Sequence, residues 1–334
     1  MTWDGKSDRG KTRPAGVYFC RTGGHEETGP GKMRHGKTML RHVFLLSALL
    51  LSVRCGNEGT RPVDGDTLPE PKGKTVDVMP LWSPADTARI GFTHAAETFE
   101  EMQRWGEHSI WIVNTVTGEK EWVTDGMLCD WSPDGNQLLF TRPYVGALLR
   151  DLRTGEESQI PVRGAPMDWS PNGTEIAYIS WETPQGLYIL DLHSLTSQRV
   201  APRFECDWSP DGQQILCDSL IVIDRTGRRM AKVPYGVEGG LPAWPRWSPD
   251  GGSIAYGGYC GEHLAGILVI SREGKDQRVV ACPGALPSWR ADGKMLAYSA
   301  LAENRATAIW VINIDGTGKK QVTFPSGWPQ GQGE

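Results

Sequence analysis

A short pattern of apolar and polar positions recurs six times between residues 77 and 324. Each copy opens with Trp-Ser-Pro-Asp-Gly or a close variant. Next comes a segment in which apolar and polar residues alternate. A second, mostly apolar segment follows, and a short third segment with polar residues at its edges ends the copy. Alternation with a period of two, broken by turn-forming residues, predicts short β-strands. The copies begin at Trp82, Trp131, Trp169, Trp208, Trp247 and Trp289.

The motif itself predicts how the strands connect. Ser-Pro-Asp-Gly suits a type I turn, with proline at the second position and glycine accepting a positive φ at the last. Each copy is therefore expected to be an antiparallel meander of four strands. A sheet of about 40 residues cannot bury both of its faces alone, but six of them can do so around one axis. We predict an all-β, six-bladed β-propeller. An open solenoid and a β-sandwich fit six near-equal copies less well.

The sequence resembles the TolB-type β-propeller repeat over about residues 77 to 324. The resemblance rests on Trp-Ser-Pro-Asp-Gly followed by Ile-Ala-Tyr, as at Trp247–Tyr256. It implies the six-bladed fold, but it does not imply one function. The family includes the periplasmic component of the Tol–Pal system, the propeller halves of prolyl-oligopeptidase-like enzymes and many lipoproteins. The Tol–Pal component carries an additional N-terminal α/β domain. This chain has a tether there, so we do not expect it to be that component.

The residues before the repeats are expected to lie outside the fold. Residues 1–38 show no apolar periodicity and are interpreted as a non-structural or mis-annotated leader, with translation starting at Met33 or Met39. Residues 39–55 combine a basic start with the apolar run 43–53, which at about 1.5 Å per residue is too short to cross a bilayer. This is typical of a secretory signal. Residues 56–76, rich in Pro, Gly and charge, are predicted to be a flexible tether.

The end of the apolar run adds a candidate lipidation site. Leu51-Ser-Val-Arg-Cys55 resembles a bacterial lipobox, although Arg54 stands where that motif has a small residue. Either lipidation of Cys55 or simple cleavage near it fits the pattern. The predicted blades are residues 77–125, 126–164, 165–202, 203–240, 241–283 and 284–324, followed by a tail at 325–334.

Composition and missing motifs exclude several classes of function. The formal net charge of −5 argues against broad nucleic-acid binding. No Gly-x-Ser-x-Gly elbow, phosphate loop or dinucleotide-binding fingerprint is present in the required setting. The α/β-hydrolase half of a prolyl-oligopeptidase-like enzyme is therefore not expected.

Strand direction alternates within each blade, which sorts the connections onto two faces. The connections between the first and second strands and between the third and fourth share one face, here called the turn face. The others share the loop face, which has the longer and more variable segments, notably 94–108 and 234–246. Insertions on one face of a repeat protein often mark its binding face. The candidate partner residues there are Phe99, Arg104, Trp105, His108, Tyr235, Trp244, Tyr259 and His263. The alternative is that such aromatic side chains pack only their own loops.

Three acids precede the repeat tryptophans, and the first strand of each blade is expected to be innermost. Asp130, Asp168 and Asp207 should therefore lie near the axis on adjacent blades; the equivalent positions elsewhere hold Leu81, Arg246 and Ser288. One interpretation is a channel site for a hard cation with oxygen ligands. The other is hydrogen bonding between blades, which we favour. No cofactor is expected otherwise.

The cysteines allow two disulfides. A two-residue turn at Asp211-Gly212 would place Cys206 directly opposite Cys217, and a bulged turn would break that pairing. Cys260 and Cys282 both lie toward the loop face. A bridge in either pair would fit an oxidising compartment. A structural zinc site is less consistent with the spacing, because no tight Cys-x-x-Cys pair exists.

These observations favour a non-catalytic propeller scaffold of the bacterial cell envelope that binds a protein, a peptide or another ligand. We expect it to be exported to the periplasm or outer surface, to reach a membrane only through a lipid anchor, and to be a monomer. The main alternative is a metal-dependent propeller enzyme, a lyase or hydrolase acting at the central channel, with His94, His108 and His263 as added ligands. The third is a purely structural envelope protein.

Overall fold

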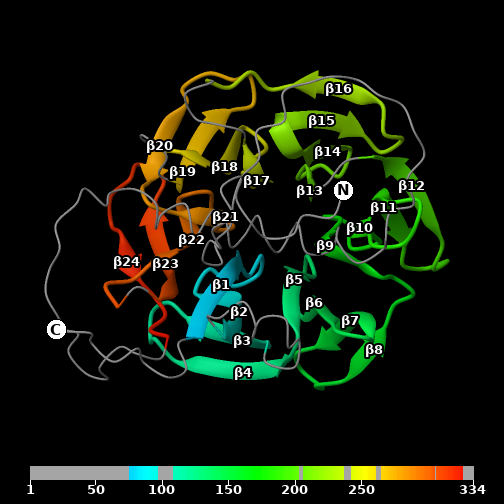
Figure 1. Ribbon diagram of the computed structural model, residues 1–334, viewed down its shortest axis with the longest axis horizontal. Helices are drawn as coiled ribbons and strands as arrows, with labels where there is room; N and C mark the ends of the chain where they lie inside the picture. Colours follow the sequence, from blue (N-terminus) through cyan, green and yellow to red (C-terminus); the bar gives the residue numbers. More distant parts are fainter. Residues whose placement is uncertain are drawn as a thin grey trace, which may run out of the picture. The chain divides into compact units, whose positions relative to one another are not determined.

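The structure, a computed structural model, describes residues 75–96, 108–202, 206–236, 242–260, 265–304 and 306–325. The chain divides into Met1–Leu40 and Arg41–Glu334, and every described residue belongs to the second unit. These residues form six four-stranded antiparallel sheets set around an axis, with the first strand of each innermost (Figure 1). The prediction of a six-bladed β-propeller is confirmed.

The strands follow one another without crossovers. Blades 1 and 2 contain β1 (Thr75–Trp82), β2 (Arg89–Ala96), β3 (Ser109–Asn114), β4 (Lys120–Asp125), β5 (Met127–Trp131), β6 (Gln137–Arg142), β7 (Gly146–Asp151) and β8 (Glu157–Gln159). Blades 3 and 4 contain β9 (Gly164–Trp169), β10 (Glu175–Ser180), β11 (Gly186–Asp191), β12 (Ser197–Ala201), β13 (Cys206–Trp208), β14 (Gln214–Cys217), β15 (Ile221–Asp224) and β16 (Arg229–Lys232). Blades 5 and 6 contain β17 (Ala243–Trp247), β18 (Ser253–Tyr259), β19 (Ala265–Ser271), β20 (Arg278–Ala281), β21 (Ala285–Trp289), β22 (Met295–Leu301), β23 (Thr307–Asn313) and β24 (Lys320–Gln321).

The helical content of the described chain is a single 3-10 turn, η2 (Asp218–Leu220), between β14 and β15. Within the same residues, no helix has the length and apolar character needed to cross a membrane. The predicted signal segment, 39–55, and the candidate lipidation site Cys55 lie outside the described residues.

The repeated motif makes the turn that its residues predict. In blade 4 the amide of Gly212 donates to the carbonyl of Ser209 at 2.8 Å, and Gly212 has a φ of 67°. The Ser209 hydroxyl accepts from the amide of Gln214 at 2.9 Å and donates to Asp211 Oδ1 at 2.6 Å. The motif therefore satisfies the polar groups at the end of the hairpin, and the strands enter in a fixed register.

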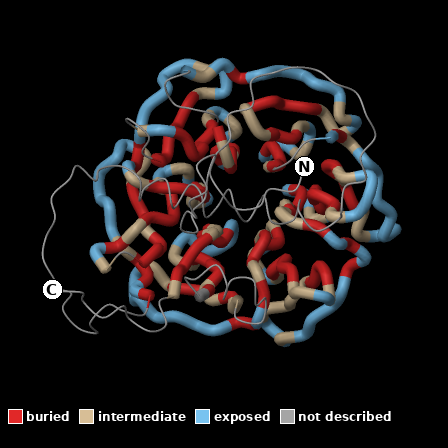
Figure 2. Tube along the Cα trace, in the orientation of Figure 1, coloured by how far each residue is buried: buried red, intermediate tan, exposed pale blue. Residues whose placement is uncertain are grey.

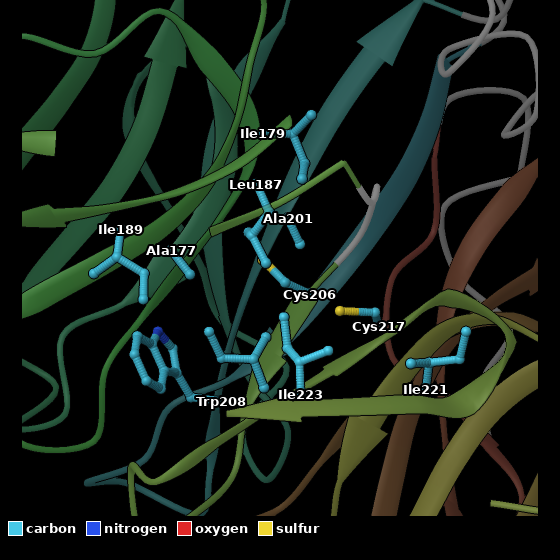
Figure 3. Packing of buried hydrophobic residues seen from close by; sticks show 11 residues of the cluster. Ala177, Ile179, Leu187, Ile189, Ala201, Cys206, Trp208, Cys217, Ile221 and Ile223 are labelled. Carbon is cyan, nitrogen blue, oxygen red and sulfur yellow. The ribbon is translucent and has the colours of Figure 1, made fainter. Parts of the chain in front are cut away.

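Apolar residues from adjacent blades form the core. Between blades 3 and 4, Trp208 packs in one cluster with Ala177 and Ile189 of the preceding blade (Figure 3). Figure 2 shows that burial is concentrated on the inner strands, while much of the outer rim is exposed. Each blade is thus stabilised mainly by its two neighbours.

The ring closes without a shared strand. Thr75–Val78 do not extend blade 6, because they pair with Thr93–Ala96 inside blade 1. Blades 1 and 6 meet through an apolar cluster that includes Trp82 and Phe92 on one side and Ile309 and Val311 on the other. Side-chain packing carries most of this junction.

Replacing Trp208 by alanine should lower the free energy of unfolding by about 3–5 kcal/mol, because the substitution leaves a cavity between two blades. Trp208 is 5% exposed, whereas Trp122 on the outer strand β4 is 51% exposed. Trp122→Ala is the matched control and should cost less than about 1 kcal/mol. Urea denaturation measures both variants. Equal losses would contradict the assignment of the repeat tryptophans to the inter-blade core.

Candidate functional site

A ring of side chains surrounds the axis at the position before each repeat tryptophan. Each is the penultimate residue of an innermost strand, so the fold brings together residues that are about 40 positions apart in the chain. In blade order the ring contains Leu81, Asp130, Asp168, Asp207, Arg246 and Ser288. Ser288 is buried and the other five are half-buried.

The three acids of this ring bind the next blade. Asp130 Oδ2 accepts the backbone N–H of Trp169 at 2.7 Å. Asp168 Oδ2 accepts that of Trp208 at 2.6 Å, and Asp207 Oδ2 accepts that of Trp247 at 2.6 Å. The prediction that these acids hydrogen-bond between blades is confirmed. Each acid positions the tryptophan that begins the neighbouring copy.

The three remaining junctions use neutral acceptors. Ser288 Oγ accepts the Trp82 backbone N–H at 2.9 Å. The carbonyl of Leu81 accepts the indole N–H of Trp131 at 2.9 Å. At the last junction, the carbonyl of Arg246 accepts the indole N–H of Trp289 at 3.1 Å. Carboxyl groups thus join blades 2 to 5, and the junctions flanking blades 1 and 6 lack them.

Crowding of acids changes their protonation. Burial raises the pKa of Asp207 to about 7; the charge of Asp168 also raises this pKa, while Arg246 opposes the shift. Burial raises the pKa of Asp168 well above its usual range, with the charge of Asp130 as the next cause. The pKa of Asp130 is raised as well, mainly by burial. The Arg246 guanidinium lies 3.3 Å from Asp207 Oδ1 and donates to the carbonyl of Cys206 at 3.2 Å.

A metal-binding constellation is absent from the described part of the chain. No group of three or more His, Cys, Asp or Glu side chains is placed there to hold an ion. His94 Nδ1 lies 2.6 Å from Asp77 Oδ1, within blade 1. His108 is half-buried just before β3, with its carbonyl accepting the N–H of Gly126, and His263 lies outside the described residues. A cation in the channel therefore remains a prediction, and the described residues provide no group of three ligands for it.

The predicted partner residues of the loop face differ in exposure. Tyr259, at the end of β18, is 42% exposed. Tyr235 is half-buried, with the Lys232 ammonium 5.4 Å from its ring centre. The expectation for Trp244 was wrong, because this side chain is only 8% exposed and packs against Ala285 and Leu286. Phe99, Arg104 and Trp105 lie outside the described residues.

Sequence reasoning missed one aromatic residue of the loop face. Tyr144, in the short connection between β6 and β7, is 97% exposed and has a φ of 62°. This backbone conformation is uncommon for a residue other than glycine and is worth examining for function. The available signal was an aromatic residue after Pro143 in a connection of only three residues.

The cysteines take two different states. Cys260 and Cys282 form a disulfide with a Cα–Cα distance of 5.9 Å, which ties the β18–β19 connection to the β20–β21 connection on the loop face. Cys206 lies directly opposite Cys217 in the β13–β14 ladder, as expected for a two-residue turn at Asp211-Gly212. Both of these residues are thiols in the structure.

Comparison with known proteins identifies the fold. No family model and no curated protein matches the sequence. Among solved structures, TolB from Acinetobacter baumannii superposes with a TM-score of 0.58 at 17% identity, over 76% of this chain and 64% of that one. The chain folds as a TolB-type six-bladed β-propeller. It spans only about two thirds of that TolB chain.

The TolB-type fold is shared with proteins of other kinds. The β-propeller domain of the Trilobed protease from Pyrococcus furiosus, described as having an open velcro topology, superposes with a TM-score of 0.53 at 11% identity, over 76% of this chain and 99% of that one. An oligogalacturonate lyase in complex with manganese gives a TM-score of 0.50 at 17% identity, over 75% and 78%. At these identities the likeness concerns the fold alone.

The raised pKa values of the axial acids predict an unusual pH dependence. The unfolded chain loses these protons near pH 4, but the folded chain keeps them to higher pH, since the pKa of Asp130 is raised to about 6, that of Asp207 to about 7, and that of Asp168 well above its usual range. The folded state binds more protons in this window, so the free energy of unfolding should fall as pH rises from 4 to 7. Asp168→Asn removes one titrating group and keeps an acceptor oxygen for the Trp208 amide. Its stability should fall less across the window, by on the order of 1 kcal/mol.

Urea denaturation between pH 4 and pH 7 measures this effect. Asp250→Asn is the control, because hydrogen bonds from Ser248 and Gly252 hold the pKa of Asp250 below its usual value. Its contribution to stability is present above pH 4 and is lost only at lower pH, so this variant should keep the wild-type slope. A slope in Asp168→Asn as steep as that of the wild type would contradict the assignment.

Proposed function

We propose that this chain is a non-catalytic scaffold of the bacterial cell envelope that binds a protein partner through the loop face of its propeller. The observation that carries the proposal is the exposure of two tyrosines on that face. Tyr144, in the loop-face connection of blade 2, is 97% exposed, and Tyr259, at the loop-face end of β18 in blade 5, is 42% exposed. Tyrosine is enriched at binding hot spots, because it offers a large, rigid apolar ring with a polar tip.

The two faces of the propeller differ in a way that supports this choice. On the turn face, the polar groups of the repeated turn are satisfied locally, as in the bonds among Ser209, Asp211 and Gln214. The exposed apolar side chains there are aliphatic, Val116 at 79% and Leu195 at 52%. Leucine and valine are under-represented among hot spots. The loop face therefore has the residue types that favour binding.

The loop face also has a covalently fixed platform. The disulfide between Cys260 and Cys282 joins two loop-face connections immediately after Tyr259. A side chain on a restrained loop loses less conformational entropy when a partner immobilises it. Tyr259 is therefore better prepared for binding than a residue on an unrestrained loop would be.

The cellular setting is inferred from the first part of the chain and from the fold. The basic stretch and apolar run within residues 39–55 are typical of an export signal, with Cys55 as a candidate anchor. The chain is similar in fold to the propeller of TolB. We therefore propose an exported protein of the periplasm or outer surface. A metal-dependent enzyme would need metal ligands that converge at the channel. A purely structural protein would not need exposed tyrosines on one face.

Replacing both loop-face tyrosines by serine should remove the main partner. The full-length protein, the Tyr144→Ser/Tyr259→Ser variant and a Leu195→Ser control would be cross-linked in native envelopes and compared by quantitative mass spectrometry. We expect at least one protein to be lost about tenfold in the tyrosine variant alone, equivalent to about 1.4 kcal/mol. All three would be checked for unchanged thermal unfolding. If the tyrosine variant retains every partner of the wild type, the loop face is not the binding face.

A further inference from the structure

Blade 4 has the shortest second and third strands of the six blades. β13 has three residues, and β14, β15 and β16 have four each, whereas β18 and β19 of blade 5 have seven each. Among the described residues, three residue pairs join β13 to β14, as many as join β17 to β18 and β21 to β22. The ladder that is shorter than in the other blades is the one between β14 and β15, which has four residue pairs.

Blade 4 also lacks an aromatic ring that the other blades share. Toward the end of the second strand, the other five carry Phe92, Phe140, Tyr178, Tyr256 and Tyr298. Blade 4 has Cys217 at this position, buried among the residues of blades 3 and 4. A thiol buries less apolar surface than an aromatic ring, so the substitution reduces packing where the ladder is already short.

The register places a second thiol directly across from Cys217. Cys206 pairs with Cys217, and both lie in the same buried cluster (Figure 3). The Ser209 amide donates to the carbonyl of Gln214, so the alternation of an antiparallel ladder makes Cys206–Cys217 a non-hydrogen-bonded pair. Such pairs have Cα atoms about 4.5 Å apart, within the range of about 4.4–6.8 Å that a disulfide spans.

We propose that Cys206 and Cys217 form a cross-strand disulfide that is introduced while blade 4 folds. The folded thiols are 3% and 0% exposed, so an external oxidant has access only before the blade is complete. A thiolate of one cysteine attacks a small-molecule or protein disulfide and expels one thiol. The second thiolate then attacks the mixed disulfide and expels the other. The two cysteines lose two protons and two electrons, and the donor disulfide takes them up and is reduced to two thiols.

The bridge would act on the axial ring as well as on blade 4. Cys206 precedes Asp207, and the carbonyl of Cys206 accepts from the Arg246 guanidinium at 3.2 Å. Asp207 in turn accepts the Trp247 amide at 2.6 Å. Fixing β13 on β14 therefore holds the residues that join blade 4 to blade 5. This inference is independent of the proposed binding face.

Oxidative refolding tests the proposal on the full chain. The reduced, unfolded protein would be refolded in a buffer of reduced and oxidised glutathione, denatured in an alkylating reagent and digested with trypsin. Cys206 and Cys217 fall in one tryptic peptide, residues 204–225. The expected product is this peptide without alkyl groups and lighter by two hydrogens. The Cys260–Cys282 bridge, which links two different peptides, shows that the buffer supports oxidation.

The outcomes separate the proposal from its alternatives. Recovery of peptide 204–225 with two alkyl groups overturns it, whether or not Cys260 and Cys282 are bridged. A bridge from Cys206 or Cys217 to any other cysteine overturns it too. Oxidation should raise the Tm of a Cys206→Ser variant by several degrees less than it raises that of the wild type, because only the Cys260–Cys282 bridge can then contribute. Cys129→Ser should show the full wild-type shift, because Cys129 is a single buried thiol in β5.

Discussion

The contact between the faces of neighbouring blades is the interaction on which the molecule depends. A four-stranded sheet of this size has two apolar faces and no means of covering them by itself. Each repeat tryptophan is placed at the end of an innermost strand, where the preceding blade lies against it. Trp208, for example, is covered by residues of blade 3 as well as by its own sheet. The ring is the arrangement in which every such face is covered.

The acids near the axis add directional hydrogen bonds between blades to this apolar packing. Asp130, Asp168 and Asp207 each accept the backbone amide of the next repeat tryptophan. These acids lie close together near the axis, so their negative charges repel one another. Their pKa values are raised, which keeps protons on them, and the Arg246 guanidinium lies beside Asp207. Blades 2 to 5 form a stretch joined in this way. Blades 1 and 6 meet through Ser288 and an apolar cluster, without a strand in common.

The periodicity of the sequence was sufficient to predict the fold, because similar residues perform the same local task in most of the copies. The serine of the motif accepts a backbone amide at the end of the hairpin in blades 2 to 5, and the glycine has a positive φ in blades 2 to 6, so the copies could be aligned by inspection. The exposure of residues at positions without such a local signal was harder to predict. Trp244 was expected on the surface because it lies in a long connection, yet the ends of β17 and β21 bury it. Tyr144 was missed because exposure is set by the surroundings of a residue, which a short connection does not reveal.

The difference between the two faces follows from the same repeat. On the turn face, successive turns lie so close that a Cβ added to Gly135 would come within 2.7 Å of the Ala85 side chain of the preceding blade. A longer or bulkier connection there would disturb its neighbour as well as its own hairpin. The loop face has no such chain of contacts through the repeated motif, so its connections can vary in length and carry exposed rings such as that of Tyr144. Because the turns of the turn face are constrained by their neighbours, residues of the loop face can change more freely without disturbing the ring of blades.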